Sequence, residues 1–198
     1  SNKGGTGKTT TSINLAVAAQ AAGYDVAMVD LDDQRNLKKW ADRRASKYHA
    51  YDIPCATASL AQFDFALSQT RGREVVIVDT PPGLNNNMSQ IAELIEVADF
   101  VIVPTQCGIF DLETVVPWSQ AIQRSKANKV SFLLNRVNTR SSELREAQSV
   151  LGRYGRLCAI PVRELTAIQK YMKAGLSLTD ISGTKDANGK RDIEDVWN

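Results

Sequence analysis

The sequence predicts an open, doubly wound α/β fold with a mainly parallel sheet and helices on both of its faces. Short apolar runs alternate with helical patterns along the whole chain, and this alternation is typical of parallel sheets. The clearest run, residues 74–79, is β-branched and has no polar alternation, so it is expected to be covered on both faces. No linker or internal repeat interrupts the pattern, and we therefore expect a single domain over residues 1–198.

Each expected element follows from its periodicity and from the residues that stop it. Apolar, β-branched runs predict strands at residues 25–30, 53–57, 74–79, 100–103, 130–134 and 157–160. Helical spacing predicts helices at residues 9–22, 37–46, 88–97, 112–125, 141–154 and 164–174. Gly23 and Gly175 are expected to end helices, and Pro104 is expected to stop a strand. The polar segment 182–198 is expected to be a mobile tail.

The composition excludes several classes of protein. No apolar run approaches the roughly 18–20 residues that span a bilayer, and no secretory leader opens the chain. We therefore expect a cytoplasmic protein without a membrane partner. The three cysteines, Cys55, Cys107 and Cys158, are isolated in the sequence, which argues against a disulfide scaffold and against a zinc ribbon.

The formal net charge of +2 conceals a basic segment. Residues 121–173 hold eleven basic and three acidic residues, a net charge of +8, whereas the rest of the chain carries −6. Such a segment can present a cationic face to a polyanion, or it can consist of solvated helix faces. Charge alone does not decide between these two interpretations.

The chain begins with a glycine-rich loop that runs directly into a helical pattern. Backbone N–H groups at a helix N-terminus bind phosphate, a lysine neutralises its oxygens, and a following hydroxyl can ligate Mg²⁺. Three glycines, Lys8 and Thr9 supply these parts, but Asn2 replaces the first glycine of the ordinary pattern and Lys3 adds a second lysine. Because a preceding strand aims such a loop, we expect a hydrophobic strand of about 5–6 residues before Ser1.

Four motifs resemble, in order, those of the ParA/MinD superfamily of ATPases. Residues 3–10, KGGTGKTT, match the deviant Walker A motif of that family. Residues 30–34, DLDDQ, resemble its second acidic motif, although an aspartate stands where the family has proline. Residues 76–83 resemble its Walker B strand and switch loop. Residues 135–136 and 160–163 resemble its base-side segments. The resemblance covers nearly the whole chain and implies a P-loop NTPase fold.

The resemblance also implies an ATPase that uses ATP and Mg²⁺, hydrolyses slowly and is stimulated by a partner. Catalytic roles fall on Lys3, which reaches the nucleotide of a second subunit, on Lys8, which holds the β- and γ-phosphates, and on Asp32, which orients the attacking water. Metal binding is implied for Thr9, Asp32 and Asp79. Nucleotide contacts are implied for Lys3, Gly4, Gly5, Thr6, Gly7, Lys8, Thr9, Thr10, Asn135, Arg136, Pro161 and Arg163. ATP then favours a homodimer, which hydrolysis releases.

Within this superfamily, the sequence favours an ATPase of DNA partition. Residues 186–198 are expected to offer too little apolar face for the amphipathic membrane helix of the MinD type, and the cysteines lack the contexts of the iron–sulfur members. Partition ATPases associate with the nucleoid, bind DNA without sequence preference and respond to a centromere- or cargo-binding partner protein. The basic segment then predicts DNA contacts at Arg136, Arg140, Arg145, Arg153, Arg156, Lys170 and Lys173. The alternatives are a related ATPase that positions a chemoreceptor array, a carboxysome or a conjugation complex, and a P-loop metabolic ligase.

Overall fold

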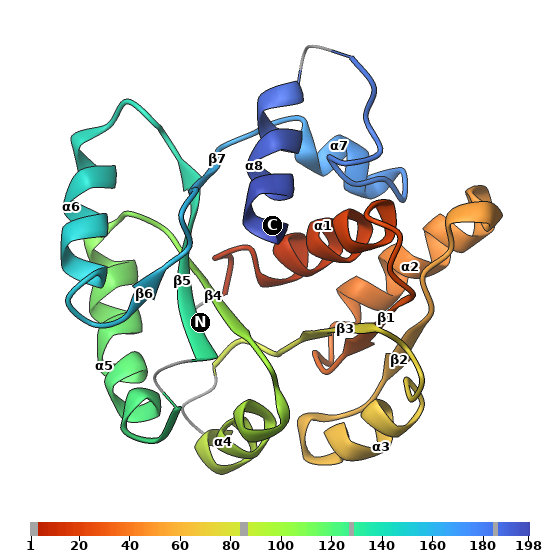
Figure 1. Ribbon diagram of the computed structural model, residues 1–198, viewed down its shortest axis with the longest axis horizontal. Helices are drawn as coiled ribbons and strands as arrows, with labels where there is room; N and C mark the ends of the chain where they lie inside the picture. The colour runs from red at the N-terminus through yellow and green to blue at the C-terminus, as the bar shows by residue number, and fades with distance from the viewer. Residues whose placement is uncertain (1–3, 84–86, 127–128, 184–185) are drawn as a thin grey trace. The chain divides into compact units, whose positions relative to one another are not determined.

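The computed structural model describes residues 4–83, 87–126, 129–183 and 186–198. Its contacts divide the chain into two compact units (Figure 1). Unit 1 consists of Ser1–Lys8 and Pro82–Glu164, and unit 2 consists of Thr9–Pro81 and Leu165–Asn198. The expectation of a single domain stays a prediction.

Unit 2 contains one parallel sheet and the helices around it. Its strands are β1 Val26–Asp30, β2 Cys55–Thr57 and β3 Val75–Asp79. Its helices are α1 Lys8–Ala21, α2 Asn36–Lys47, α3 Phe63–Ser68, α7 Ile168–Lys173 and α8 Ala187–Trp197, with the 3-10 helices η1 His49–Tyr51 and η2 Leu60–Gln62. The strand order is β2-β1-β3, so the two neighbours of β1 lie on opposite sides of it.

Burial in unit 2 is greatest along the central strand. All five residues of β1 are buried, and Ile13 of α1, Met28 of β1 and Trp40 of α2 have no exposed surface. In β3, by contrast, residues 75–78 are only half-buried, although the sequence predicted a strand covered on both faces. The reason is position, because β1 has a strand on each side whereas β3 pairs only with β1 among the residues described.

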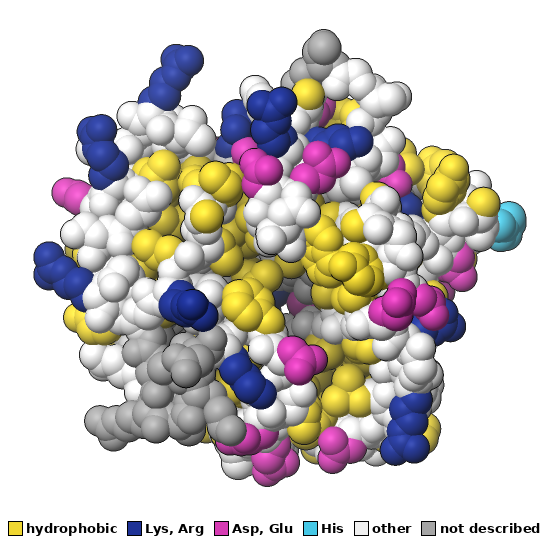
Figure 2. Space-filling model, in the orientation of Figure 1, with side chains coloured by type: hydrophobic (Ala, Val, Ile, Leu, Met, Phe, Trp, Pro, Cys, Tyr) yellow, Lys and Arg dark blue, Asp and Glu magenta, His cyan; other side chains and the backbone are white. Residues whose placement is uncertain are grey.

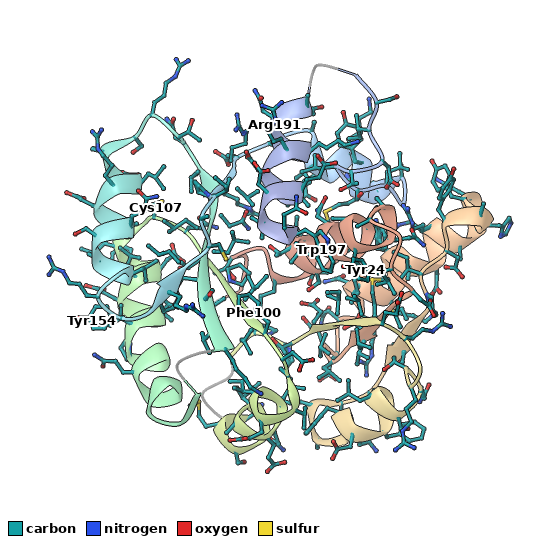
Figure 3. The ribbon with its side chains drawn as sticks, viewed as in Figure 1. Tyr24, Phe100, Cys107, Tyr154, Arg191 and Trp197 are labelled. Atoms are coloured by element: carbon teal, nitrogen blue, oxygen red, sulfur yellow. The ribbon has the colours of Figure 1, made fainter. Side chains whose placement is uncertain are left out.

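The C-terminal segment forms α8, where the sequence predicted a mobile tail. Ile193 is 2% exposed, and Trp197 packs on the core of unit 2. Figure 3 shows Trp197 beside Tyr24, and the two ring centroids are 5.6 Å apart. The segment holds few apolar residues, but their helical spacing places them on one buried face, so its polar composition was a misleading signal.

Unit 1 contains a second parallel sheet. Its strands are β4 Val101–Thr105, β5 Val130–Val137, β6 Arg156–Leu157 and β7 Val162–Arg163. Its helices are α4 Met88–Val97, α5 Ile109–Lys126 and α6 Ser142–Leu151. The strand order is β4-β5-β6, and β7 also pairs with β5. All strand pairs among the described residues are parallel and helices flank the sheets, which confirms the predicted fold class.

Two expected strand ends in unit 1 are wrong. Pro104 lies inside β4, in register with Leu133, and it is tolerated because β4 is the edge of this sheet, where a missing N–H need not break a ladder. The strand β5 continues past Leu134, and its register with β7 shifts between Asn135 and Val137. The polar residues at this irregularity end the apolar run without ending the strand.

The last two elements of the expected order also differ. The helix predicted at residues 164–174 is shorter, Ile168–Lys173, and the strand β7 that precedes it was not predicted. A two-residue strand carries too little periodicity to be read from sequence. Along the described ranges, no helix combines the length and the apolar character that a bilayer span requires.

Candidate functional site

The glycine-rich loop, residues 4–8, belongs to unit 1 and leads into α1. Gly5 has φ +85° and Gly7 has φ +97°, a backbone conformation that other residues rarely adopt. Lys8 is the first residue of α1, a helix of 14 residues, so the loop ends where backbone N–H groups and the helix dipole favour an anion. Gly4 and Gly5 are exposed. Lys3 lies outside the described residues.

Two side-chain amides of unit 1 contact the backbone of this loop. Asn135 Nδ2 donates a hydrogen bond to the Thr6 carbonyl at 2.9 Å, and Gln106 Nε2 donates one to the Gly5 carbonyl at 3.2 Å. The last paired residues of β4 and β5 are Thr105 and Leu134, so Gln106 and Asn135 each directly follow that pair. Gln106 was not predicted from the sequence. The signal that could have found it is its position directly after β4, at the same sheet edge as Asn135.

In unit 2, the structure brings Thr9 and Asp79 together. The Thr9 hydroxyl donates a hydrogen bond to Asp79 Oδ2 at 2.6 Å, and the Ser12 hydroxyl lies 3.5 Å from Asp79 Oδ1. Asp79 is 2% exposed and is the last residue of β3, so its carboxylate lies at the carboxyl end of the sheet. A threonine hydroxyl and an aspartate beside a phosphate site are the groups that hold Mg²⁺ in nucleotide-hydrolysing P-loop proteins.

The acidic motif occupies the end of the neighbouring strand. Asp30 pairs in register with Asp79 and is fully buried. Its carboxylate accepts hydrogen bonds from the backbone N–H of Asp32 at 3.0 Å and of Lys38 at 2.9 Å. Asp30 therefore fixes the loop that carries Asp32, which supports a structural role for it. Asp32 is half-buried and its Oδ1 accepts from the N–H of Gln34 at 2.9 Å.

The turn that follows Asp32 forms without the proline of the family motif. Asp33 stands in its place and is exposed. Arg35 adopts φ 51°, and its Nη1 donates to the carbonyls of Asp30 and Ala58, both at 2.7 Å. These bonds connect the end of β1 to the residue that follows β2. Arg35 therefore stabilises the turn at the position where Asp33 replaces the proline of the family motif.

The donor set predicted for Mg²⁺ consists of Thr9, Asp32 and Asp79. Within the described ranges, no group of three or more His, Cys, Asp and Glu side chains is arranged to hold a metal by itself. One hydroxyl and one or two carboxylates nevertheless fit Mg²⁺, which keeps several waters and takes further ligands from phosphate. The contact between Thr9 and Asp79 fits this requirement, and the metal role of all three residues stays a prediction.

The predicted base-side residues lie on two neighbouring strands of unit 1. Asn135 of β5 pairs with Val162 of β7, which places Pro161 and Arg163 beside it. Pro161 and Arg163 are half-buried, whereas Arg136 is exposed and has φ 55°. The structure thus brings these residues together, and their contact with a nucleotide base stays a prediction.

None of the three cysteines has the lowered pKa that a nucleophilic thiol requires. Burial, together with the negative charge of Asp30, raises the pKa of the Cys55 thiol to about 12. Burial also raises the pKa of Cys107, which Figure 3 labels, and of Cys158. A thiol above its ordinary pKa holds little thiolate near neutral pH, so none of the three is activated.

The predicted DNA contacts divide between the units. All seven side chains are exposed: Arg136, Arg140, Arg145, Arg153 and Arg156 in unit 1, and Lys170 and Lys173 in unit 2. Among the described residues, Arg140, Arg145 and Arg153 form no ion pair. Figure 2 shows separate Lys and Arg side chains projecting over the region of α6.

The sequence is similar to known proteins along nearly its whole length. A family model described as the CobQ/CobB/MinD/ParA nucleotide binding domain matches residues 1–53. The maintenance of carboxysome distribution protein A of Gloeobacter kilaueensis is 32% identical over 200 residues, which cover 98% of this chain and 88% of that protein. The chromosome partitioning protein ParA of Caulobacter vibrioides is 29% identical over 166 residues, which cover 64% of this chain and 61% of ParA.

Solved structures share the fold at lower identity. The MinC:MinD cell division protein complex of Aquifex aeolicus matches with a TM-score of 0.75 and 14% identity, covering 100% of this chain and 91% of that chain. A putative plasmid partition protein of Borrelia burgdorferi B31, bound to AMPPNP, matches with a TM-score of 0.71 and 17% identity, covering 100% and 94%.

Proposed function

This chain belongs to the ParA/MinD superfamily of ATPases, and we propose that it is a DNA-partition ATPase whose state is set by bound ATP. The observation that carries the proposal is the contact between Thr9 and Asp79, 2.6 Å apart, directly after the glycine-rich loop. Thr9 directly follows Lys8, the lysine of the proposed phosphate site, and its hydroxyl meets the carboxylate of Asp79 from the end of β3, as a Mg²⁺ site requires. The similarity to a chromosome partitioning ParA favours DNA as the cargo.

Each residue of the site has a physical role in this proposal. The loop N–H groups and Lys8 hold the β- and γ-phosphates, because a helix N-terminus and an ammonium group both favour negative charge. Thr9 and Asp79 hold Mg²⁺, which neutralises charge that develops on the phosphates. Asp32 orients and polarises the attacking water. Asp30 keeps Asp32 in place through the hydrogen bond to its backbone N–H.

ATP also controls assembly in this proposal. Lys3 of one subunit contacts the nucleotide of a second subunit, so that ATP forms part of a homodimer interface. Hydrolysis removes the γ-phosphate and with it the charge that the second subunit contacts, and the dimer separates. A centromere- or cargo-bound partner protein accelerates that step.

The exposed arginines of unit 1 are the proposed contacts to the nucleoid. Arg140, Arg145 and Arg153 carry positive charge that no described carboxylate neutralises. DNA phosphates are the polyanion that such charges bind without sequence preference, through the release of counterions. We therefore propose non-specific DNA binding by the ATP-bound form.

A change at Asp32 tests the catalytic proposal. Asp32→Ala should lower kcat by about 10²–10³-fold and leave ATP affinity nearly unchanged, because the residue acts on water rather than on the phosphates. Asp33→Ala is the matched control, since Asp33 is an exposed carboxylate one residue away. ATPase assays with both variants decide, and unchanged turnover in Asp32→Ala would reject the assignment.

The salt dependence of DNA binding tests the nucleic-acid proposal. Replacing both Arg145 and Arg153 with alanine should reduce the slope of log K against log salt by about 2, if each arginine neutralises one phosphate. Lys47→Ala is the control, because Lys47 is exposed and lies outside the basic segment. An unchanged slope in the double variant, measured with ATP-loaded protein and plasmid DNA, removes these residues from the interface.

A second candidate is a positioning ATPase for another cargo. The 32% identity to a carboxysome distribution protein over nearly the whole chain favours it. A strain that lacks this gene separates the two: raised plasmid loss supports partition, whereas clustered microcompartments with normal plasmid inheritance support cargo positioning. A metabolic ligase predicts neither result, and its ATP turnover depends on a small substrate and is indifferent to DNA.

A further inference from the structure

Two neutral side-chain amides, of Asn135 and Gln106, donate hydrogen bonds to backbone carbonyls of the glycine-rich loop. Asn135 is 5% exposed, and its amide donates to the carbonyl of Thr6, a residue that is 2% exposed. Gln106 donates to the carbonyl of Gly5. The two acceptors are consecutive along the backbone, and all four residues lie in unit 1. Two adjacent peptide units of the loop are therefore held in a fixed orientation.

Fixing these carbonyls also fixes the N–H groups behind them. A trans peptide unit is planar, and its N–H points away from its C=O. The Gly5 carbonyl shares its peptide unit with the N–H of Thr6, and the Thr6 carbonyl shares its unit with the N–H of Gly7. Hydrogen bonds that draw both carbonyls toward the ends of β4 and β5 direct both N–H groups to the opposite side of the loop.

The amide of Asn135 is itself oriented by its neighbour. Its Oδ1 accepts a hydrogen bond from the backbone N–H of Arg136 at 3.0 Å, which leaves the NH₂ end to face the loop. This bond lies at the irregularity of β5, where Arg136 has φ 55°. A Cβ on Gly7 would clash with Asn135 Nδ2, so glycine at this position also permits the close approach of the amide.

We propose that Asn135 and Gln106 are positioning residues that preorganise the glycine-rich loop for phosphate. The inference rests on the proposed nucleotide function and assigns to these residues a part of it that no motif carries. Donors that are already oriented before binding need no reorganisation when phosphate arrives. Because Asn135 acts through the loop backbone, its contribution to affinity does not depend on the base of the nucleotide.

Nucleotide titrations test the consequence of this arrangement. Asn135→Ala removes one amide, and Gln106→Met removes the other while keeping the length of the side chain. Each variant should bind mant-ATP and mant-GTP more weakly than the original protein, by the same factor of about tenfold for both nucleotides. Asn138→Ala is the matched control, because Asn138 is an exposed asparagine just beyond β5 whose Oδ1 accepts from the N–H of Arg140 in the turn.

Two results would overturn the inference in this experiment. A loss of affinity for mant-ATP alone would mean that Asn135 contacts the nucleotide base. Lower thermal stability with unchanged affinities for both nucleotides would leave these amides with a structural role only.

Backbone relaxation by NMR tests the positioning itself without any nucleotide. The order parameters of Gly5, Thr6 and Gly7 should fall from about 0.85 in the original protein toward about 0.6 in both variants. If the original protein binds no nucleotide, the proposed function fails and this measurement still decides the positioning role. Unchanged order parameters in Gln106→Met would overturn the inference even if Asn135→Ala does not fold.

Discussion

The two units hold their polar groups in different ways. In unit 2, the guanidinium of Arg44 is 1% exposed, forms a bidentate ion pair with Asp180 at 2.8 and 2.9 Å, and stacks on Trp40. In unit 1, the glycine-rich loop is exposed at Gly4 and Gly5 and is tied by two neutral amides. Stability and activity therefore depend on separate contacts. Loss of the ion pair should destabilise the protein, whereas loss of the loop contacts should lower its ATPase activity.

The largest effect is expected from the ion pair of the buried Arg44 with Asp180 in unit 2. Asp180→Ala leaves the Arg44 charge buried without its partner, which should lower the free energy of unfolding by about 3–5 kcal/mol. Asp42→Ala is the control, because it breaks a surface ion pair with Lys38. The side chain of Asp42 is 62% exposed, so its loss should lower the free energy of unfolding by less than about 1 kcal/mol. Urea titrations measure both, and equal midpoints would contradict the contrast between buried and surface pairs.

The loop of unit 1 should show the opposite behaviour. Lys8→Ala removes the cation at the phosphates and should lower kcat/KM for ATP by about 10²–10³-fold, while the urea midpoint changes little. Lys39→Ala serves as the control, since Lys39 is an exposed lysine of α2. If Lys8→Ala destabilised the protein as much as Asp180→Ala does, the proposed separation of stability from activity would be wrong.

Acid should lower the stability of unit 2, because protonation of Asp180 removes its ion pair with Arg44. Burial by itself would raise the pKa of Asp180, but hydrogen bonds from Arg44 and Ser177 outweigh it and hold that pKa below the ordinary value of 3.8. A depressed folded pKa means that the stabilisation is present above the unfolded value and is lost as pH falls through the folded one. We expect a level free energy of unfolding from about pH 7 to about pH 5 and a decrease below about pH 4.

Circular dichroism during acid titration checks this expectation. Asp180→Asn cannot titrate at this position, so its stability should decrease less steeply than that of the original protein over the same acid range. Identical slopes for the two proteins would assign the acid sensitivity to other carboxylates.

The smallest expected effect is a difference in thiol reactivity between the units. Cys55 in unit 2, with a pKa of about 12, should react with iodoacetamide more slowly than Cys107 in unit 1, whose pKa burial also raises. Alkylation near neutral pH follows the fraction of thiolate. Mass spectrometry of peptides from the native protein gives the order of modification, and Cys55 reacting first would contradict it.

The sequence predicted the three strands and the first two helices of unit 2 well, because these elements are set by local patterns. The β-branched run at residues 75–79 and the buried run at residues 26–30 form strands close to the expected bounds, and the helix at residues 88–97 of unit 1 is confirmed at both ends. The exceptions depend on position in the sheet or on tertiary packing. Pro104 is tolerated by its place on an edge strand, and α8 gains its order from the packing of Ile193 and Trp197.

The site divides in the same way. Glycines with positive φ, the lysine at the start of α1 and the aspartate at the end of β3 follow motifs that can be read along the chain. The positions of Gln106 and Asn135 after neighbouring strands can be read from the sequence, but their bonds to the Gly5 and Thr6 carbonyls could not be predicted, because each bond joins residues more than one hundred positions apart. Only the pairing of β4 with β5 brings the two amides to one edge.

Sedimentation of the Asp32→Ala protein with a fluorescent DNA duplex tests the central claim most directly, since this variant should hold ATP without hydrolysing it. We expect a dimer that sediments with DNA in ATP and a monomer free of DNA in ADP. A monomer in both nucleotides, or equal DNA binding in both, would contradict the proposal that ATP sets the state of this protein.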